Sequence, residues 1–368
     1  MADICIIGAG SSGVTVAKAL REKGLAFDMF EKGSDIGGMW RYENDNGQSS
    51  CYASLHIDTS RPNLGYSDFP IDPSLPDFLS HAQFLRHLEA YADANGIREL
   101  VTFGTRVDRV EPDGQRWRVT LANGESRDYV SVVCANGHLW DPRMPDFPGH
   151  FDGHVIHSHH YRTAAPYDGK RVLVVGLGNS AVDIAVDIAR RAAHVTVSTR
   201  RSAWIMPKYL MGIPIDQWSG FLVRRLGLPV VWSRWIMSRL IRLGVGAQRR
   251  FGLPRPEHPM WREHATLSQE LLPYIGHGYI DIKPEVDFGA GQSREISEHY
   301  ATYVSTQVRR MQESQIIDVA MNDSDFLAAV ASRPAELGEI KSAGQCARGL
   351  DVDAPQDSDS TMVVVTVV

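Results

Sequence analysis

The stretch ICIIGAGSSG (residues 4–13) decides the fold of the N-terminal part of the chain. Apolar residues typical of a β-strand lead directly into a G-x-G-x-x-G turn, and a helix is expected over residues 14–23. The first glycine of such a turn permits the tight bend, the second lets a pyrophosphate approach the backbone, and the third lets helix and strand pack closely. Unpaired N–H groups at the helix N-terminus then favour an anion.

The residues that follow complete a β-α-β unit. Gly24 is placed to end the helix, and Leu25–Phe30 form a second apolar strand that closes at Glu31. An acid at that strand end accepts hydrogen bonds from the hydroxyls of a ribose. Because strand, turn, helix and acid occur together, we predict a dinucleotide site instead of a merely structural turn. Its expected residues are Gly8, Ala9, Gly10, Ser11, Ser12, Gly13 and Glu31.

A second unit of the same kind repeats the first about 168 residues later, so that Gly176 corresponds to Gly8. A strand over residues 170–175 leads into GLGNSA (residues 176–181), in which alanine takes the third glycine position. A helix over residues 182–191 and a strand over residues 194–199 follow. Two such units imply two bound nucleotides, and the lack of a short-period repeat excludes a solenoid.

The second unit ends differently from the first. Its last strand is followed by Arg200 and Arg201 instead of an acid. A cation there suits a ribose 2′-phosphate, so we expect NADP on this unit. The alternative is that both arginines are solvated surface charges. Together the two units indicate FAD and NADPH, with hydride passing from NADPH to FAD.

We therefore predict an α/β protein with two doubly wound, Rossmann-like dinucleotide-binding domains. The NADPH domain (residues 166–280) is inserted into the FAD domain (residues 1–165), and residues 281–368 form a return segment and a divergent tail. A small antiparallel β-meander is also expected. Its strands are predicted at residues 101–110, 115–121 and 129–135, with Asp113-Gly114 and Asn123-Gly124 as hairpin turns.

Composition narrows the class of protein. The 368 residues carry 38 Lys and Arg against 44 Asp and Glu, a net charge of −6 that excludes a strongly basic nucleic-acid binder. Cys5, Cys51, Cys134 and Cys346 are too far apart in sequence to indicate a disulfide scaffold or a zinc site, and Cys5 and Cys134 are expected to be buried. No signal peptide and no apolar run long enough to span a membrane is evident, so we expect a cytoplasmic protein.

Beyond the glycine turns, the sequence resembles the flavin-containing monooxygenases, a family of class B flavoprotein monooxygenases. The pattern F-x-G-x-x-x-H-x-x-x-Y lies between the two turns as Phe151, Gly153, His157 and Tyr161. Tyrosine at its last position favours the heteroatom-oxidising branch, since the related Baeyer–Villiger enzymes carry tryptophan. The resemblance runs to about Pro284, and its other pieces are GGMWRY (37–42), YSDFP (66–70), ANGH (135–138) and VGLGNSAVDI (175–184).

The resemblance implies which residues contact the cofactors. Met39 and Trp40 would line the FAD together with the first turn. The nicotinamide nucleotide would contact residues of the second unit. These are Gly176, Gly178, Asn179, Ser180, Ala181, Asp183, Arg200 and Arg201.

One position departs from the family. The family has an asparagine near the flavin in an Asn-Thr-Ser-Lys-like segment, and here Asp58 takes its place, followed by Thr59. Ionised aspartate cannot donate a hydrogen bond, and its charge would disfavour an anionic reduced flavin unless Arg61 or another cation compensates. Asp58 is our first catalytic candidate, and its presence keeps ketone oxygenation open.

Histidines are concentrated in the connector between the two units. No cysteine or glutamate completes a familiar metal-ligand spacing around them, so no metal site is expected. His157 is our second catalytic candidate, although anchoring the linker is favoured because no acid–base partner stands at motif spacing. The five histidines are His150, His154, His157, His159 and His160.

Residues 219–251 combine Trp, Leu and Ile with arginines. Two interpretations are open: helices packed on the NADPH domain with arginines in water, or a peripheral contact with a membrane. The first is favoured, because basic amphipathic helices are frequent false positives.

The tail departs from the family as well. The expected strand that returns to the FAD sheet does not follow Pro284. Residues 293–321 resemble an amphipathic helix, residues 351–360 are acidic and polar, and residues 361–368 are strand-like without an obvious partner.

The function implied by the resemblance is an NADPH- and O2-dependent flavin monooxygenase. It would oxygenate a soft nucleophile, the nitrogen or sulfur of a small molecule, through a C4a-hydroperoxyflavin. Two alternatives stay open: a Baeyer–Villiger-type ketone monooxygenase or uncoupled NADPH oxidase, and a truncated nucleotide-binding protein without turnover. Paired redox cysteines are absent, which disfavours a flavin disulfide reductase, and a homodimer is left open.

Overall fold

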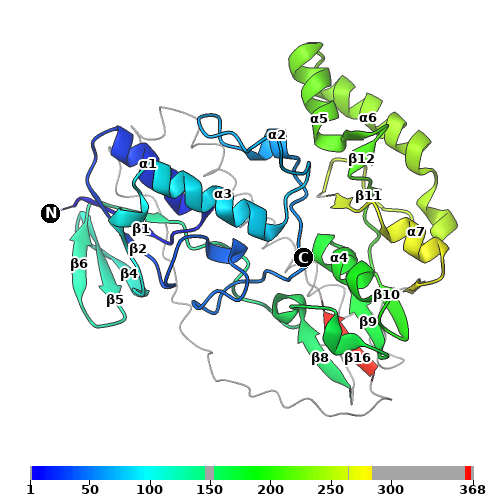
Figure 1. Cartoon of the computed structure of the whole chain (residues 1–368), viewed down its shortest axis with the longest axis horizontal. Helices are drawn as coiled ribbons and strands as arrows, with labels where there is room; N and C mark the ends of the chain where they lie inside the picture. The colour runs from blue at the N-terminus through cyan, green and yellow to red at the C-terminus, as the bar shows by residue number, and fades with distance from the viewer. Residues whose placement is uncertain (1, 146–152, 264, 284–360, 366–368) are drawn as a thin grey trace. The chain divides into compact units, whose positions relative to one another are not determined.

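The computed structural model of the chain describes residues 2–145, 153–263, 265–283 and 361–365 (Figure 1). These residues form two compact units, each with its own parallel sheet. The first contains residues 2–49 and 85–140, and the second contains residues 50–84 and the described residues from 141 onward. The predicted α/β class, with two Rossmann-like parallel sheets, is confirmed.

The first unit opens with the predicted β-α-β arrangement: β1 (Ile4–Ile7), α1 (Ser11–Glu22) and β2 (Phe27–Phe30). β1 pairs in parallel with β2 and with β7 (Ser131–Cys134), and β3 (Val101–Thr102) adds to β2, giving the order β3-β2-β1-β7. The apolar residues of α1 at helical spacing are buried, and the helix ends just before Gly24, whose φ is +68°. The buried residues are Gly13, Val14, Val16, Ala17 and Leu20.

Short helices occur in both units. They are η1 (Gly38–Trp40) and η2 (Arg98–Leu100) in the first unit, and α2 (Arg61–Leu64) in the second. The longer α3 (His81–Ala94) begins in the second unit and continues in the first.

The antiparallel meander exists, but its outer strands differ from the prediction. β4 (Val107–Asp113), β5 (Arg116–Leu121) and β6 (Ser126–Tyr129) form it, with positive φ at both hairpin glycines. Residues 101–110 divide between β3 and β4, because Gly104 breaks the strand with a φ of +60°. Residues 129–135 divide between β6 and β7, since the N–H groups of Val130 and Ser131 bond to Asp3 O and turn the chain into the parallel sheet. The prediction of a buried Cys134 is wrong: it ends β7 and is exposed, while Cys5 is buried.

The second unit contains the repeated β-α-β arrangement in a larger sheet. β9 (Arg171–Val175), α4 (Asn179–Ile188) and β10 (His194–Ser198) follow the prediction. β15 (Ile280–Lys283), which follows α7 (Leu271–Gly276), pairs with β10, so the start of the predicted return segment belongs to this sheet. Buried aliphatic side chains of β9, β10 and α4 form the core, chiefly Val172, Val174, Ile184, Ile188, Val195 and Val197.

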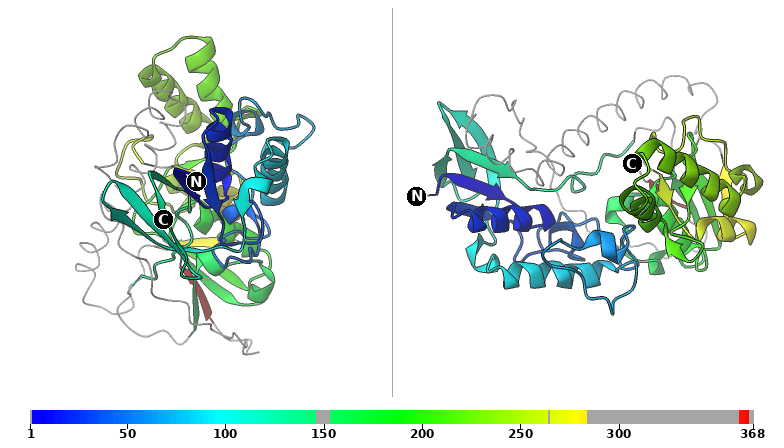
Figure 2. Two further views of the ribbon diagram at one scale, coloured as in Figure 1. Left: turned by 90° about the vertical axis from the view of Figure 1, so that its left-hand side faces the viewer. Right: turned by 90° about the horizontal axis from the view of Figure 1, so that it is seen from above.

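The C-terminal strand has a partner, contrary to the prediction. β16 (Thr361–Val365) lies between β9 and β8 (His154–His157), parallel to both, in the order β15-β10-β9-β16-β8 (Figures 1 and 2). The apolar run alone could not predict that this strand lies inside the sheet, because an alternating pattern does not indicate which strand it pairs with. The predictions for residues 293–321 and 351–360, and those for His150, Phe151 and Cys346, lie outside the described residues.

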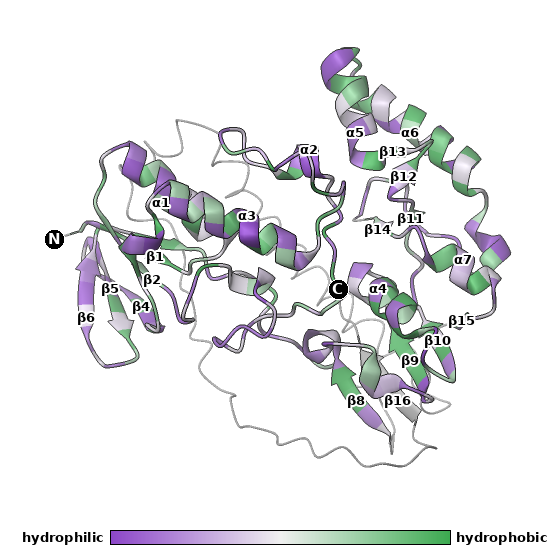
Figure 3. Cartoon of the chain, in the orientation of Figure 1, coloured by the Kyte–Doolittle hydropathy of each residue, from purple (hydrophilic) through white to green (hydrophobic). Residues whose placement is uncertain are grey.

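The second unit also contains η3 (Ser158–His160), η4 (Ala165–Tyr167), β11 (Ile205–Met206), β12 (Tyr209–Leu210), β13 (Ile213–Pro214), α5 (Ile215–Gly220), the π-helix η5 (Phe221–Arg225), α6 (Val230–Val245), η6 (Gln248–Phe251) and β14 (Thr266–Leu267). Buried residues of α5, η5 and α6 contribute to a second, smaller core. One face of α6 packs into this core through Met237 and Ile241. Figure 3 shows that α6 carries both apolar and polar residues along its length. Among the described residues, no helix combines the length and apolarity that crossing a bilayer requires.

The place of β16 generates a stability prediction. Val363 pairs with Val155 on one side and Leu173 on the other, so Val363→Pro removes a backbone donor from the inside of a sheet, at a cost of about 3 kcal/mol or more. We expect thermal unfolding of this variant to begin several degrees lower, whereas Val363→Ile, which keeps the N–H, should unfold like the parent. Equal unfolding of the proline variant and the parent would contradict the placement of β16.

Candidate functional site

The first glycine turn has a backbone that only glycine can form. Gly8 has a φ of +101°, and its N–H donates to Phe30 O at 2.8 Å. A Cβ on Gly8 would lie 2.5 Å from Ala135 O, and a Cβ on Gly13 would lie 1.9 Å from Gly8 O. A Cβ on Gly10, by contrast, would meet only Gly38 Cα, at 3.8 Å. A Cβ on Gly10 would therefore make only an ordinary van der Waals contact, and the bare backbone of Gly10 lies at the N-terminus of α1, where a pyrophosphate can approach it.

Glu31 supports this turn from the end of β2. Its side chain is buried, Oε2 accepts from the Ala9 N–H at 2.7 Å, and Oε1 accepts from the Gly33 N–H at 2.8 Å and from Asn46 Nδ2 at 3.3 Å. Each carboxylate oxygen can accept two hydrogen bonds, so Oε2 keeps capacity for a ribose hydroxyl. Ribose binding by Glu31 stays a prediction, and its bracing of Ala9 is an additional role that the motif did not indicate.

The segment with Met39 and Trp40 lies against the same turn. The Gly37 N–H donates to Ala9 O at 3.0 Å, and a Cβ on Gly38 would lie 3.1 Å from Gly10 Cα. The structure thus gathers the first turn, Glu31 and η1 within the first unit, as the resemblance implies. The residues of the first unit fit a dinucleotide, because Gly10 has no Cβ where the pyrophosphate would lie and the Glu31 carboxylate stands at the end of the next strand.

The second turn repeats the geometry of the first. Gly176 has a φ of +123°, and its N–H donates to Ser198 O at 2.9 Å. Gly178 has φ −79° and ψ 177°, close to the φ −77° and ψ −171° of Gly10. The first backbone hydrogen bond of the helix is also the same in both turns. The Val14 N–H donates to Gly10 O, and the Val182 N–H donates to Gly178 O, each at 3.0 Å. The second turn therefore has the backbone form that a dinucleotide-binding turn takes, and it fits a dinucleotide on the ground of that backbone.

Contacts beyond the motif hold the second turn. Asn179 Oδ1 accepts from the Leu267 N–H at 2.8 Å, and Thr266 Oγ1 donates to Leu177 O at 2.6 Å. The Asn179 side chain thus ties the turn to β14, a role that the sequence could not show. Arg200 is half-buried and Arg201 is exposed just after β10.

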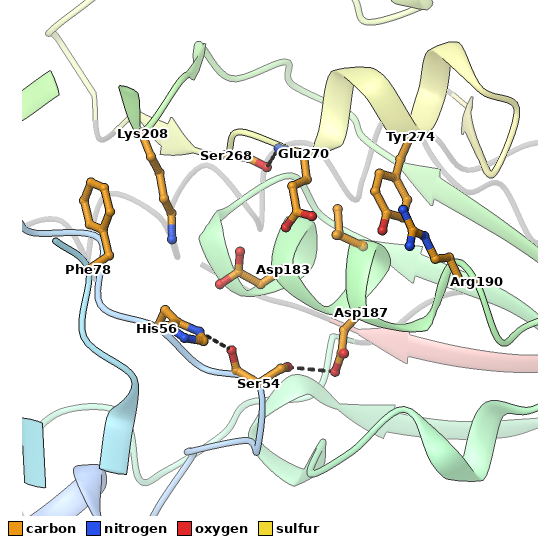
Figure 4. Close-up of a pocket in the computed structure, with 11 residues that line it drawn as sticks. Ser54, His56, Phe78, Asp183, Asp187, Arg190, Lys208, Ser268, Glu270 and Tyr274 are labelled. Carbon is orange, nitrogen blue, oxygen red and sulfur yellow. Dashed lines mark hydrogen bonds between the residues drawn. The ribbon is translucent and has the colours of Figure 1, made fainter. Parts of the chain in front are cut away.

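A cavity of about 380 Å³ lies in the second unit beside α4 (Figure 4). Asp183 accepts a hydrogen bond from the Tyr52 hydroxyl at 2.8 Å, and Asp187 accepts from Ser54 Oγ at 2.8 Å and from the Tyr161 hydroxyl. Helix α4 is therefore bonded to the segment after residue 50 through two carboxylates one turn apart. The cavity is lined by Ser54, His56, Phe78, Asp183, Val186, Asp187, Arg190, Lys208, Ser268, Glu270 and Tyr274.

Asp183, placed at the nicotinamide by the resemblance, has an unusual environment. Burial raises the pKa of its carboxyl to about 7, and the negative charge of Asp58 adds to the effect. Lys208 and the Tyr52 hydroxyl act in the opposite direction but do not restore the ordinary pKa of 3.8. A carboxyl with this pKa exchanges a proton near neutral pH.

Asp58 has a counter-ion in the second unit. Lys208 Nζ lies 3.0 Å from Asp58 Oδ1, and both side chains are mostly buried. The ammonium also lies 5.5 Å from the centroid of the Phe78 ring, and Figure 4 shows it pointing into the cavity. The cation that compensates Asp58 is therefore Lys208, which sequence spacing could not identify, and Thr59 follows in the same half-buried segment.

His157 ends β8 as a buried residue. Its Nδ1 accepts from the His159 N–H at 3.0 Å, so the side chain caps η3. Burial, and then the neighbouring His159 and His160, lower its pKa to about 4, which keeps the imidazole neutral at neutral pH. Among the described residues no group of three metal-ligating side chains occurs.

Asp183 generates a pH prediction. Its folded-state pKa of about 7 exceeds its ordinary 3.8, so ionisation opposes folding, and its contribution to stability is lost as the pH rises from about 4 to about 7. Asp183→Asn removes the charge and keeps an oxygen for Tyr52. In urea unfolding, the stability of the parent relative to this variant should fall over that range.

Asp168→Asn serves as the control of opposite sign. The hydrogen bond from Arg191 lowers the pKa of Asp168, so the parent should gain stability relative to that variant as the pH rises through the acid range. A parent–Asp183→Asn difference that is flat with pH would contradict the assigned environment.

The Asp58–Lys208 pair generates a second prediction. Lys208→Met leaves a mostly buried carboxylate without its counter-ion, whereas the double variant with Asp58→Asn removes both charges. A double-mutant cycle in urea should give a coupling energy of about 1–2 kcal/mol. The exposed pair Arg109–Glu111 is the matched control, and its cycle should give a value near zero. Equal values for the two pairs would overturn the prediction.

Comparison with known proteins places the chain in a family. The profile described as Flavin-binding monooxygenase-like matches residues 2–306. Flavin-containing monooxygenase 5 of Rattus norvegicus is 35% identical over 303 residues, and Flavin-containing monooxygenase 3 of Homo sapiens is 33% identical over 305 residues. Each match covers 77% of this chain and 56% of the relative, so the chain spans a little over half of their length.

Solved structures agree with this result. The flavin-containing monooxygenase from Stenotrophomonas maltophilia is 28% identical with a TM-score of 0.51, over 56% of this chain and 60% of that one. OTEMO in complex with FAD and NADP has a TM-score of 0.58 over 78% of this chain and 67% of that one; at 22% identity it shows a shared fold alone. With two matching glycine turns and a family profile that covers most of its length, the chain belongs to the flavin-binding monooxygenase-like family.

Proposed function

We propose that this chain is an FAD-dependent monooxygenase that consumes NADPH and O2 and oxygenates the nitrogen or sulfur of a small molecule. The observation that carries the proposal is the repeated turn geometry, with Gly8 and Gly176 at positive φ and each bonded to the end of the next strand. Bound FAD supplies hydride acceptance and oxygen activation, which protein side chains do not provide.

The residues of each turn have distinct roles in this proposal. The backbone at Gly10, which carries no side chain, receives the FAD pyrophosphate, and the remaining acceptor capacity of Glu31 receives the ribose. Gly178 has the same role for NADPH, and Arg200 with Arg201 supplies the cations that favour a 2′-phosphate. The flavin and nicotinamide rings then need a site from which bulk water is excluded.

The names of relatives support oxygenation of nitrogen or sulfur. Dimethylaniline monooxygenase [N-oxide-forming] 2 of Oryctolagus cuniculus is 33% identical over 303 residues. The S-allyl-L-cysteine S-oxygenase from Allium sativum is 32% identical with a TM-score of 0.50, over 54% of this chain and 51% of that one. Tyr161, at the last position of the connector pattern, is the residue that favours this branch.

A second candidate is ketone oxygenation of the Baeyer–Villiger type, or uncoupled NADPH oxidation. The Asp58–Lys208 ion pair is the observation that favours this second candidate, because a carboxylate and an ammonium stand where the resemblance implies a neutral amide. A nucleotide-binding protein without turnover is the remaining alternative. A homodimer, a cytoplasmic location and a membrane contact through residues 219–251 stay predictions.

The test of the proposed function is oxygen uptake by the FAD-loaded full chain with NADPH. With a thioether or a tertiary amine present, we expect sulfoxide or N-oxide to form in step with NADPH consumption. Lactone or ester formed from a ketone would select the second candidate, and hydrogen peroxide as the sole oxygen product would select uncoupled oxidation. No oxygen uptake by FAD-loaded protein would leave only nucleotide binding.

The absence of a side chain at Gly10 generates a matched prediction. Gly10→Ala adds a Cβ that the fold accommodates but a bound pyrophosphate does not. We expect at least a tenfold weaker FAD affinity by fluorescence titration, on the order of the loss of one good contact, with unchanged thermal unfolding without FAD. Gly276→Ala, whose Cβ would also meet an atom only at 3.8 Å, is the control and should bind FAD normally. Equal affinities for the two variants would place the flavin elsewhere.

A further inference from the structure

The cavity beside α4 sets one ammonium group against two carboxylates. Lys208 Nζ lies 3.0 Å from Asp58 Oδ1, and the lysine charge also acts on Asp183. Figure 4 shows that the side chains of Asp183 and Lys208 are directed into the same cavity. One cation does not neutralise two carboxylates, so the second loses its charge only by taking up a proton. Because Asp58 holds the cation, Asp183 is the carboxylate that is left to take up the proton.

Hydrogen bonds leave one oxygen of Asp183 available for that proton. The Tyr52 hydroxyl donates to Oδ2 at 2.8 Å, and among the described residues no donor is bonded to Oδ1. Asp187, one turn further along α4, accepts from two hydroxyls, those of Ser54 and Tyr161. Hydrogen bonds of that kind stabilise an ionised carboxylate. The two aspartates of α4 are therefore suited to different states, Asp183 to the protonated form and Asp187 to the ionised form.

The other charged groups that line the cavity lie at its solvent side. Glu270, His56 and Arg190 are all exposed. Burial is the largest cause of the raised pKa of Asp183, which is about 7, and the negative charge of Glu270 adds to it. The exposed lining side chains also give solvent protons access to the cavity. Asp183 is therefore able to lose a proton inside the cavity and to regain one from solvent.

The reaction proposed above consumes a proton. NADPH, O2, one proton and the substrate give NADP+, water and the oxygenated product. NADPH and the nitrogen or sulfur atom of the substrate each supply two electrons, and these four electrons reduce both oxygen atoms. One oxygen atom bonds to the substrate, and the other leaves as water with the hydrogen of NADPH and the proton. A site from which bulk water is excluded therefore needs a group that supplies this proton.

We propose that Asp183 holds this proton on Oδ1 and gives it to the oxygen atom that leaves as water. The inference rests on the proposed function and adds a proton donor to it. Asp183 stands five residues after Gly178, about 7.5 Å along the axis of the helix that begins at the second turn. The catalytic candidate His157 is not suited to this role, because burial lowers its pKa to about 4 and it carries no imidazolium proton at neutral pH.

The first measurement is the infrared difference spectrum of the full chain between pH 6 and pH 8. We expect a carboxylic acid band at pH 6 that is lost at pH 8. Asp183→Asn should lack this change, and Asp183→Glu should retain it. Asp187→Asn, the matched control one turn away on α4, should show the same change as the parent. This measurement needs no cofactor, and thermal unfolding verifies that each variant is folded.

The second measurement is oxygenation of a thioether by the FAD-loaded chain with NADPH, followed against pH. The parent's rate should fall by about tenfold per pH unit above neutral pH, as loss of one essential proton requires. Asp183→Asn should be slower at pH 6 by on the order of 100-fold and nearly independent of pH, and Asp183→Glu should recover most of the rate. Reduction of the flavin by NADPH without oxygen should be slowed less than product formation, because hydride transfer takes up no proton.

The outcomes separate this inference from the proposed function. A parent without the carboxylic acid band, identical pH profiles for the parent and Asp183→Asn, or equal slowing of flavin reduction and product formation would each overturn the inference alone. Equal slowing would assign Asp183 to positioning of the nicotinamide. No oxygen uptake by the parent at any pH would overturn the proposed function, and the inference with it.

Discussion

One backbone hydrogen bond occurs twice among the described residues, and both proposed nucleotide sites depend on it. The N–H of the first turn glycine reaches the carbonyl at the end of the neighbouring strand, from Gly8 to Phe30 and from Gly176 to Ser198. That bond requires a positive φ, which glycine adopts without strain. The next glycine then presents bare backbone at the N-terminus of a helix, where unpaired N–H groups and the helix dipole favour phosphate.

The chemistry differs between the turns because the strand ends differ. In the first unit a buried carboxylate, Glu31, both braces the turn and keeps an acceptor for a ribose. In the second unit, arginines follow the strand, and the helix that begins at the turn carries two aspartates. Asp183 and Asp187 bind Tyr52 and Ser54, so the segment that contains Asp58 packs with the second unit. Lys208 completes this arrangement by neutralising Asp58, a position where the family resemblance implies an uncharged amide.

The sequence was sufficient for the turns, because a glycine spacing between a strand and a helix is a local constraint. It was insufficient wherever the partner was distant in sequence. No pattern links Lys208 to Asp58 across 150 residues or Tyr161 to Asp187, and period-two alternation could not place β16 inside the sheet of the second unit. The meander strands were misjudged at their outer ends, since an extended run can leave one sheet and enter another at a single break such as Gly104.

The proposed function requires that electrons pass between two nucleotides, each held on its own glycine turn. Mixing the FAD-loaded chain with NADPH in the absence of oxygen measures this transfer, with the yellow absorbance of oxidised flavin as the signal. We expect this absorbance to be lost, faster with NADPH than with NADH because of Arg200 and Arg201. Flavin that binds and stays oxidised through many equivalents of NADPH would show that no such transfer occurs.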